Sequence, residues 1–220
     1  MKNLFKALFT FAIVATTFTS CMKKDNTDYD AINLEEDKRV DALLTEQKIL
    51  IEAYVNSGFE NSGFENPVED TVLHRLSFLG KTVKRGIWYE ERSVPTDNSY
   101  EYRLNDNGTT VIWPKVKIKY TATLLDGTPV QSDEAGSDYT FSNPNLNVMN
   151  NVWVYAFFPY SIRFNGNDEI IGGLTKDGLK KGSIFRMVTP SYWAFDTRTN
   201  IKDIPADSPL IYEFEVLAIE

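Results

Sequence analysis

The stretch "IPADSPLIYEFEVLAIE", residues 204–220, decides the fold. After the turn signal of Ile204-Pro205, apolar residues alternate with Glu213 and Glu215, so one face is apolar and the other charged. This period of two is typical of a β-strand with one buried face. The apolar face carries Leu210, Tyr212, Phe214, Val216 and Ala218. Such a strand needs a sheet that ties it down, so the remaining sequence should supply further strands.

Those further strands are found upstream. "VKIKYTATLLDGTPV" (116–130) alternates in the same way and passes through Asp126-Gly127, a strong hairpin signal. "GIWYEERSV" (86–94) and "SIFRMVTP" (183–190) add two more strands, and "EIIGGLTKDGLKKG" (169–182) is the only short helix candidate in this half. Many strands with one short helix predict an α+β domain in which a curved antiparallel sheet wraps that helix.

An N-terminal helix is predicted over 34–55. Asn33, followed three residues later by Glu36, is a capping-box-like start. Its apolar residues recur at helical spacing and are Val40, Leu43, Leu44, Leu50, Ile51 and Tyr54. The helix either docks a partner or dimerises, or its apolar stripe packs on the domain behind it, and we favour packing.

The first 21 residues, "MKNLFKALFTFAIVATTFTSC", differ from the rest. Lys2 and Lys6 precede a short apolar stretch and then small residues, which is typical of a secretory signal rather than a membrane span. "FTSC" (18–21) resembles the lipobox of bacterial lipoproteins, in which the cysteine is lipidated. We expect a signal peptide over 1–20, and at Cys21 a palmitate-type anchor that holds the protein on a membrane of the cell envelope. A plain signal peptide is the alternative.

Charge and composition narrow the function further. The chain has 23 basic and 31 acidic residues, and the signal holds two of the basic ones. The net charge of the mature chain is therefore 21 minus 31, or −10. An acidic protein without a basic run argues against nucleic acid as a partner. Cys21 is the only cysteine, which excludes internal disulfides. His74 is the only histidine, and we interpret it as a structural residue. We therefore expect no metal site, catalytic triad or cofactor.

Four blocks of the sequence resemble FKBP-type peptidyl-prolyl isomerases, in the order in which that family has them. They are "VKIKYTATLLDGTPVQS" (116–132), "PYSIRFNGNDEIIGGL" (159–174), "LKKGSIFRMVTPSYWAF" (179–195) and "IPADSPLIYEFEVLAI" (204–219). The resemblance covers about residues 86–220 and implies a half-barrel of antiparallel strands around a short helix. The implied organisation is a tether over 21–33, a helical segment with a loop over 34–85, and an FKBP-like domain over 86–220 with an insertion at about 133–158.

The resemblance also implies a function. Rotation about an Xaa-Pro bond must break amide resonance, against a barrier of about 18–20 kcal/mol. An apolar, aromatic site favours the twisted transition state, so no acid, base or metal is needed. Matched position by position, the site that binds proline-containing segments is Tyr120, Val130, Gln131, Tyr160, Ile170, Ile171, Leu174, Phe195, Ile204 and Tyr212. Without the resemblance, ordinary core packing would explain these aromatic and aliphatic residues.

Several positions depart from the family pattern. Gln131 stands where the family has Asp, Phe195 where it has Tyr, and Leu174 where it has the Trp of the pocket floor. We therefore hold two main readings, a lipid-anchored prolyl isomerase or folding helper, and an FKBP-like binding module that holds a protein partner. A stand-alone structural protein of the envelope is a third and weaker one, and we lean to the isomerase.

Overall fold

The structure is a computed structural model that describes residues 28–96 and 100–220. The predicted signal peptide, Cys21 and most of the predicted tether lie outside these described residues. Among the described residues, no helix combines the length and apolar character needed to cross a membrane.

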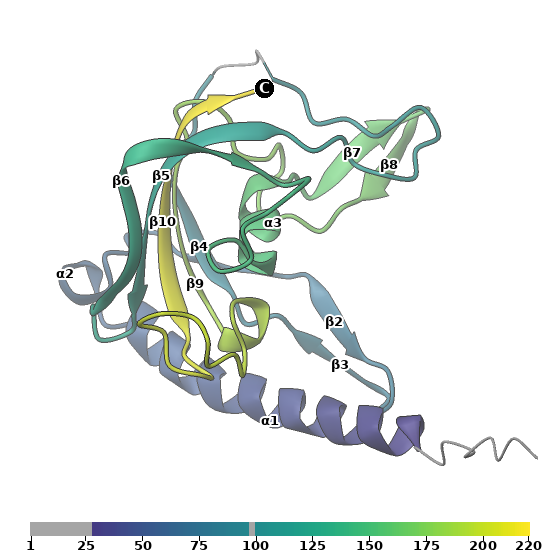
Figure 1. Cartoon of the computed structure of the whole chain (residues 1–220), viewed down its shortest axis with the longest axis vertical. Coiled ribbons are helices and arrows are strands. Elements are labelled where there is room, and N and C mark those ends of the chain that lie inside the picture. Colours follow the sequence, from purple (N-terminus) through teal and green to yellow (C-terminus); the bar gives the residue numbers. More distant parts are fainter. Residues whose placement is uncertain (1–27, 97–99) are drawn as a thin grey trace, which may run out of the picture.

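Six strands form one antiparallel sheet in the order β1-β4-β9-β10-β5-β6 (Figure 1). They are β1 Val68–Glu69, β4 Trp88–Ser93, β5 Lys115–Leu124, β6 Pro129–Thr140, β9 Ile184–Thr189 and β10 Leu210–Ile219. The strand predicted from residues 204–220 is β10, and it lies inside the sheet between β5 and β9. Its register places Tyr212 opposite Ala122 on one side and Met187 on the other.

The sheet curves around a short helix, α3 Asn151–Phe157 (Figure 1). Along β5 the side chains alternate between exposed and buried, as the period of two predicts, with Ile118 and Ala122 fully buried. The buried face of the sheet packs against Trp153 and Phe157 of α3 in one hydrophobic core. The predicted α+β class is therefore confirmed, and so is the predicted curved antiparallel sheet around a short helix.

The helix is not where the sequence placed it. The prediction of a short helix over 169–182 is wrong, because this segment holds the end of β8 and then a series of turns and bends. Gly172 and Gly178 there have φ angles of 84° and 71°, which a right-handed helix does not allow. The helix lies instead inside the predicted insertion at 133–158, the first part of which extends β6.

The predicted N-terminal helix is α1 Tyr29–Val55, and it begins earlier than expected. Asp28, rather than Asn33, caps it, because the Asp28 carboxylate accepts a hydrogen bond from the Ala31 N–H at 3.0 Å. One face of α1 is buried against the domain, as expected if its apolar stripe packs there. The buried residues of that face are Val40, Leu44, Gln47, Ile51 and Val55. Leu50, predicted for the same face, is 49% exposed.

Two hairpins stand outside the main sheet, on the side of α3 that faces away from it (Figure 1). They are β2 Leu73–Leu76 with β3 Lys81–Lys84, and β7 Ser161–Phe164 with β8 Asn167–Ile170. A short helix, α2 Phe59–Ser62, and a 3₁₀ turn, η1 Ser191–Trp193, complete the elements of the described residues.

A buried ion pair connects the start of the domain to α3. The Arg85 Nε donates to the Asp70 carboxylate at 2.5 Å, and both side chains are only 4% exposed. The Val72 N–H donates to the same carboxylate at 2.9 Å. The Arg85 guanidinium carbon also lies 4.1 Å from the ring centroid of Tyr155, a residue of α3.

We expect Asp70→Ala to lower the free energy of unfolding by about 3–5 kcal/mol, because it leaves the Arg85 charge buried without a partner. The neighbouring pair Glu69 and Lys84 is a matched control, since it also has an N–O distance of 2.5 Å but leaves the lysine side chain 49% exposed. Glu69→Ala should cost less than about 1 kcal/mol. Urea unfolding of both variants measures this, and equal losses would contradict the role of burial.

A second prediction concerns Gln47, which fixes α1 to the domain. Its amide donates to the Ser191 hydroxyl at 3.0 Å and to the Asp207 carbonyl at 2.7 Å, and it accepts from the Ser191 N–H at 2.8 Å. Gln47→Ala should lower the free energy of unfolding by about 1–3 kcal/mol and speed hydrogen exchange in α1, because it leaves a buried N–H unpaired. The exposed neighbour Glu46, changed to Ala, is the control, and unchanged exchange in α1 would refute the prediction.

Candidate functional site

Neighbouring strands place aromatic side chains on the concave face of the sheet. Tyr120 on β5 lies opposite Phe214 on β10 in the register, and Tyr212 lies two residues before Phe214 on the same face. The Tyr212 and Phe214 rings stack with centroids 5.6 Å apart and planes 7° from parallel. The alternation of apolar and polar residues in these two strands therefore positions both tyrosines that the sequence assigned to the site.

Trp153 of α3 fills the space in front of these rings. It is fully buried, and its ring centroid lies 5.0 Å from that of Tyr120 and 5.1 Å from that of Phe214, both edge-on. The concave face is thus packed by the chain's own helix. Sequence reasoning placed Trp153 in an insertion. The signal that could have located it is Asn150, a helix-capping residue type two residues before the apolar run 152–158.

Both tyrosines of the cluster stay protonated at neutral pH. Burial raises the pKa of Tyr120 to about 12, and the negative Asp133 adds to this. Burial also raises the pKa of the Tyr212 phenol, although the hydrogen bond with Asn150 acts in the opposite direction. Neither phenol carries a charge at neutral pH, so neither acts as a base there.

A strap, residues 142–150, crosses the edge of this cluster between the end of β6 and α3. The Gln131 Nε2 donates to the Asn147 carbonyl at 2.7 Å. From the other side, Arg198 donates to the Leu146 carbonyl at 2.7 Å and to the Asn147 side chain at 3.2 Å. These bonds fix the backbone carbonyls of Leu146 and Asn147 at the edge of the cluster.

The inner end of the strap closes over Tyr212. The Asn150 Nδ2 donates to the Tyr212 hydroxyl at 2.9 Å, and the adjacent Met149 is 4% exposed. Tyr212 itself is 0% exposed. In the closed arrangement that the structure shows, a ligand therefore has no access to the Tyr212 ring or hydroxyl.

The remaining predicted site residues fall into two groups. The first group joins the same hydrophobic core as Tyr120 and Tyr212: Leu174, Phe195 and Ile204 are buried in it, and Val130 and Ile171 pack against it partly buried. The second group is Tyr160 and Ile170, which are 44% and 62% exposed at the base of the β7–β8 hairpin. The short helix predicted over 169–182 does not form beside them, because Ile170 ends β8.

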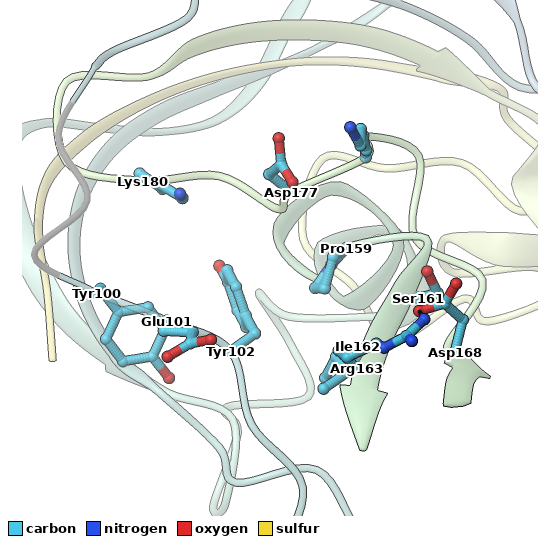
Figure 2. Close-up of a pocket in the computed structure, with 11 residues that line it drawn as sticks. Tyr100, Glu101, Tyr102, Pro159, Ser161, Ile162, Arg163, Asp168, Asp177 and Lys180 are labelled. Carbon is cyan, nitrogen blue, oxygen red and sulfur yellow. Dashed lines mark hydrogen bonds and ion pairs between the residues drawn. The ribbon is translucent and has the colours of Figure 1, made fainter. Parts of the chain in front are cut away.

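A separate cavity of about 580 Å³ lies beside β7 (Figure 2). Its lining comes from residues 100–102, from the β7–β8 hairpin and from residues 176–180, and contains none of the predicted site residues. Tyr102 forms part of the wall and is fixed there by a hydrogen bond from its hydroxyl to the Leu179 carbonyl at 2.8 Å.

No family model and no curated protein matches this chain. Among solved structures, it is similar to a peptidyl-prolyl cis-trans isomerase from Pseudomonas syringae pv. tomato, with a TM-score of 0.46 and 15% identity over 82% of this chain and 95% of that one. It is also similar to FkpA from Escherichia coli, with a TM-score of 0.39 and 18% identity over 87% of this chain and 70% of that one. The three FKBP domains of wheat FKBP73 match with a TM-score of 0.39 and 16% identity over 68% of this chain and 48% of theirs.

Proposed function

We propose that this chain is a lipid-anchored folding helper of the cell envelope that acts as an FKBP-type prolyl isomerase on Xaa-Pro segments. One observation carries the proposal. Residues that the resemblance assigns to the pocket wall, far apart in the sequence, join one hydrophobic core. They are Tyr120, Leu174, Phe195, Ile204 and Tyr212, with Val130 and Ile171 packed at the border.

The chemistry fits these side chains. A planar prolyl amide becomes less polar as it twists and loses its resonance, so an apolar aromatic surface binds the twisted state better than the planar one. The neutral phenol of Tyr212 and the amide of Gln131 are the hydrogen-bonding groups beside that surface. In the proposed complex, a substrate carbonyl takes the Gln131 hydrogen bond that the Asn147 carbonyl holds in the closed form.

The strap sets the limit on this activity. Because it covers Tyr212, a peptide binds only in the fraction of molecules in which the strap has moved away, and the apparent affinity falls by that fraction. The same closure favours the second candidate function, an FKBP-like module that holds a protein partner without turnover. Its supporting observation is the 0% exposure of Tyr212.

The proposed membrane anchor is tested at Cys21. We expect the wild-type chain, expressed in a bacterium, to incorporate labelled palmitate and to sediment with membranes, because two or more acyl chains anchor a protein stably. Cys21→Ser should incorporate no label and leave the membrane fraction. Release of the wild-type protein without label would instead establish the plain signal peptide.

The isomerase is tested by exchange NMR on an Xaa-Leu-Pro-Phe peptide with wild type and Arg198→Ala. Arg198→Ala removes two hydrogen bonds to the strap, so we expect it to raise kcat/KM about threefold to tenfold by populating the open form. The matched control is Arg75→Ala, an exposed arginine on β2, which should leave the rate unchanged.

The outcomes separate the two functions. Catalysis that increases in Arg198→Ala alone supports an isomerase whose site the strap covers. If folded samples of all three proteins give only the uncatalysed rate, the isomerase proposal is refuted and the binding module stands. Tyr212→Ala is a poor control because it empties a fully buried site, so Tyr212→Phe, which loses only the hydroxyl, is used to test that group.

A further inference from the structure

The outer edge of β7 presents backbone groups that point away from its partner strand. The hairpin register pairs Ile162 with Glu169 and Phe164 with Asn167 across a two-residue loop. In an antiparallel pair, alternate residues direct their N–H and C=O groups to the partner and the others direct them outward. Phe164 and Ile162 are the inward residues, so Ser161 and Arg163 direct theirs to the outer edge.

Among the described residues, no hydrogen-bond partner is found for these outward groups. The base of the hairpin follows the same alternation, because the Tyr160 carbonyl accepts from the Ile171 N–H at 2.9 Å on the inner side. Within residues 28–96 and 100–220, the backbone groups of Ser161 and Arg163 pair with neither another strand nor a loop. An open strand edge of this kind is a template for an added strand.

Ser161, Ile162 and Arg163 of β7 line the cavity of about 580 Å³, together with Asp168 of β8. Figure 2 shows Tyr100 and Tyr102 across the cavity from β7, with β8 on the far side of β7. The two tyrosine rings pack edge-on with centroids 5.0 Å apart. The Ile162 side chain is buried, with 4% exposed, so one face of the hairpin is apolar. The side chains of a strand added along β7 would therefore alternate between this apolar face and solvent.

The charges around the cavity balance. Arg163, Lys176 and Lys180 are opposed by Glu101, Asp168 and Asp177, three of each sign. Arg163 and Asp168 also pair with each other at 3.1 Å. A cavity with no net charge gives no preference to a nucleic acid or another polyanion, whereas it suits an uncharged segment held by backbone hydrogen bonds.

The turn and the base of the β7–β8 hairpin are both fixed by the chain's own residues. Asn165 and Gly166 have φ angles of 48° and 87°, as the tight two-residue turn requires, and asparagine with glycine is the favoured pair there. At the base, the Tyr160 N–H donates to the Thr175 carbonyl at 2.7 Å. A fixed edge avoids part of the ordering cost of binding.

We infer that β7 is a second polypeptide-binding site, which takes an extended, uncharged segment of another chain as an added strand. The segment bonds to the outward backbone groups of Ser161 and Arg163 and places an apolar side chain in the cavity against Tyr102. This site is separate from the strap-covered cluster and does not depend on isomerase activity, so it would act as a holding site for an unfolded chain.

The test uses the full chain and an acetylated, amidated peptide of alternating threonine and valine. Arg163→Pro removes the outward N–H of β7, which the hairpin itself does not use. Ile170→Pro is the matched control, because Ile170 lies directly opposite Ser161 and its N–H points outward from the other edge. Ile170 does not line the cavity.

By NMR titration, Arg163→Pro should weaken peptide binding about tenfold, the effect of one lost hydrogen bond of about 1.4 kcal/mol. Ile170→Pro should bind like wild type, and the Ser161 amide should become protected from exchange when peptide binds. A peptide N-methylated on alternate residues should not bind wild type, which tests the site even if a proline variant disturbs the hairpin. Equal binding by both variants, equal loss in both, or binding of the methylated peptide would overturn the inference.

Discussion

The burial of Trp153 is the interaction on which the rest of the structure depends. A curved sheet with an apolar inner face must cover that face, and in this chain α3 covers it with a fully buried indole. Rings from β5, β6 and β10 meet that indole at centroid distances between 5.0 and 5.2 Å. Because the strap leads directly into α3, the packing that completes the core also closes the candidate site. Stability and access to Tyr212 are therefore coupled in one segment.

The sheet could be predicted from the sequence because its strands repeat with a period of two. This alternation predicted the strands β5 and β10 directly. It also predicted that Tyr120 and Tyr212 lie on the inner face of the sheet. The helix could not be located in this way. α3 is only seven residues long and rich in valine and aromatic residues, which favour strands, whereas the segment chosen instead contains glycines with positive φ.

The positions of the predicted site residues could be anticipated only in part, for a related reason. Alternation along β5 and β10 fixed which way Tyr120 and Tyr212 point. Tyr160 and Ile170 were assigned by resemblance alone, and they are exposed because the hairpin that carries them is separate from the sheet. Polar partners such as Gln47 and Ser191 are 144 residues apart in the sequence, so no local pattern could reveal them. The contacts between Arg198 and the strap could not be predicted for the same reason, because their partners are 52 and 51 residues away in the sequence.

The position of β10 inside the sheet has a consequence for how the chain folds. Its partner β5 precedes it by four other strands and α3, so the centre of the sheet is made of contacts between distant parts of the chain. Such contacts form only after a large loss of chain entropy, and domains built on them fold in about milliseconds to seconds rather than microseconds. Until β10 docks, the apolar strands β5 and β9 each have an unpaired edge. The chain is thus most prone to aggregate during the interval before its own central strand arrives.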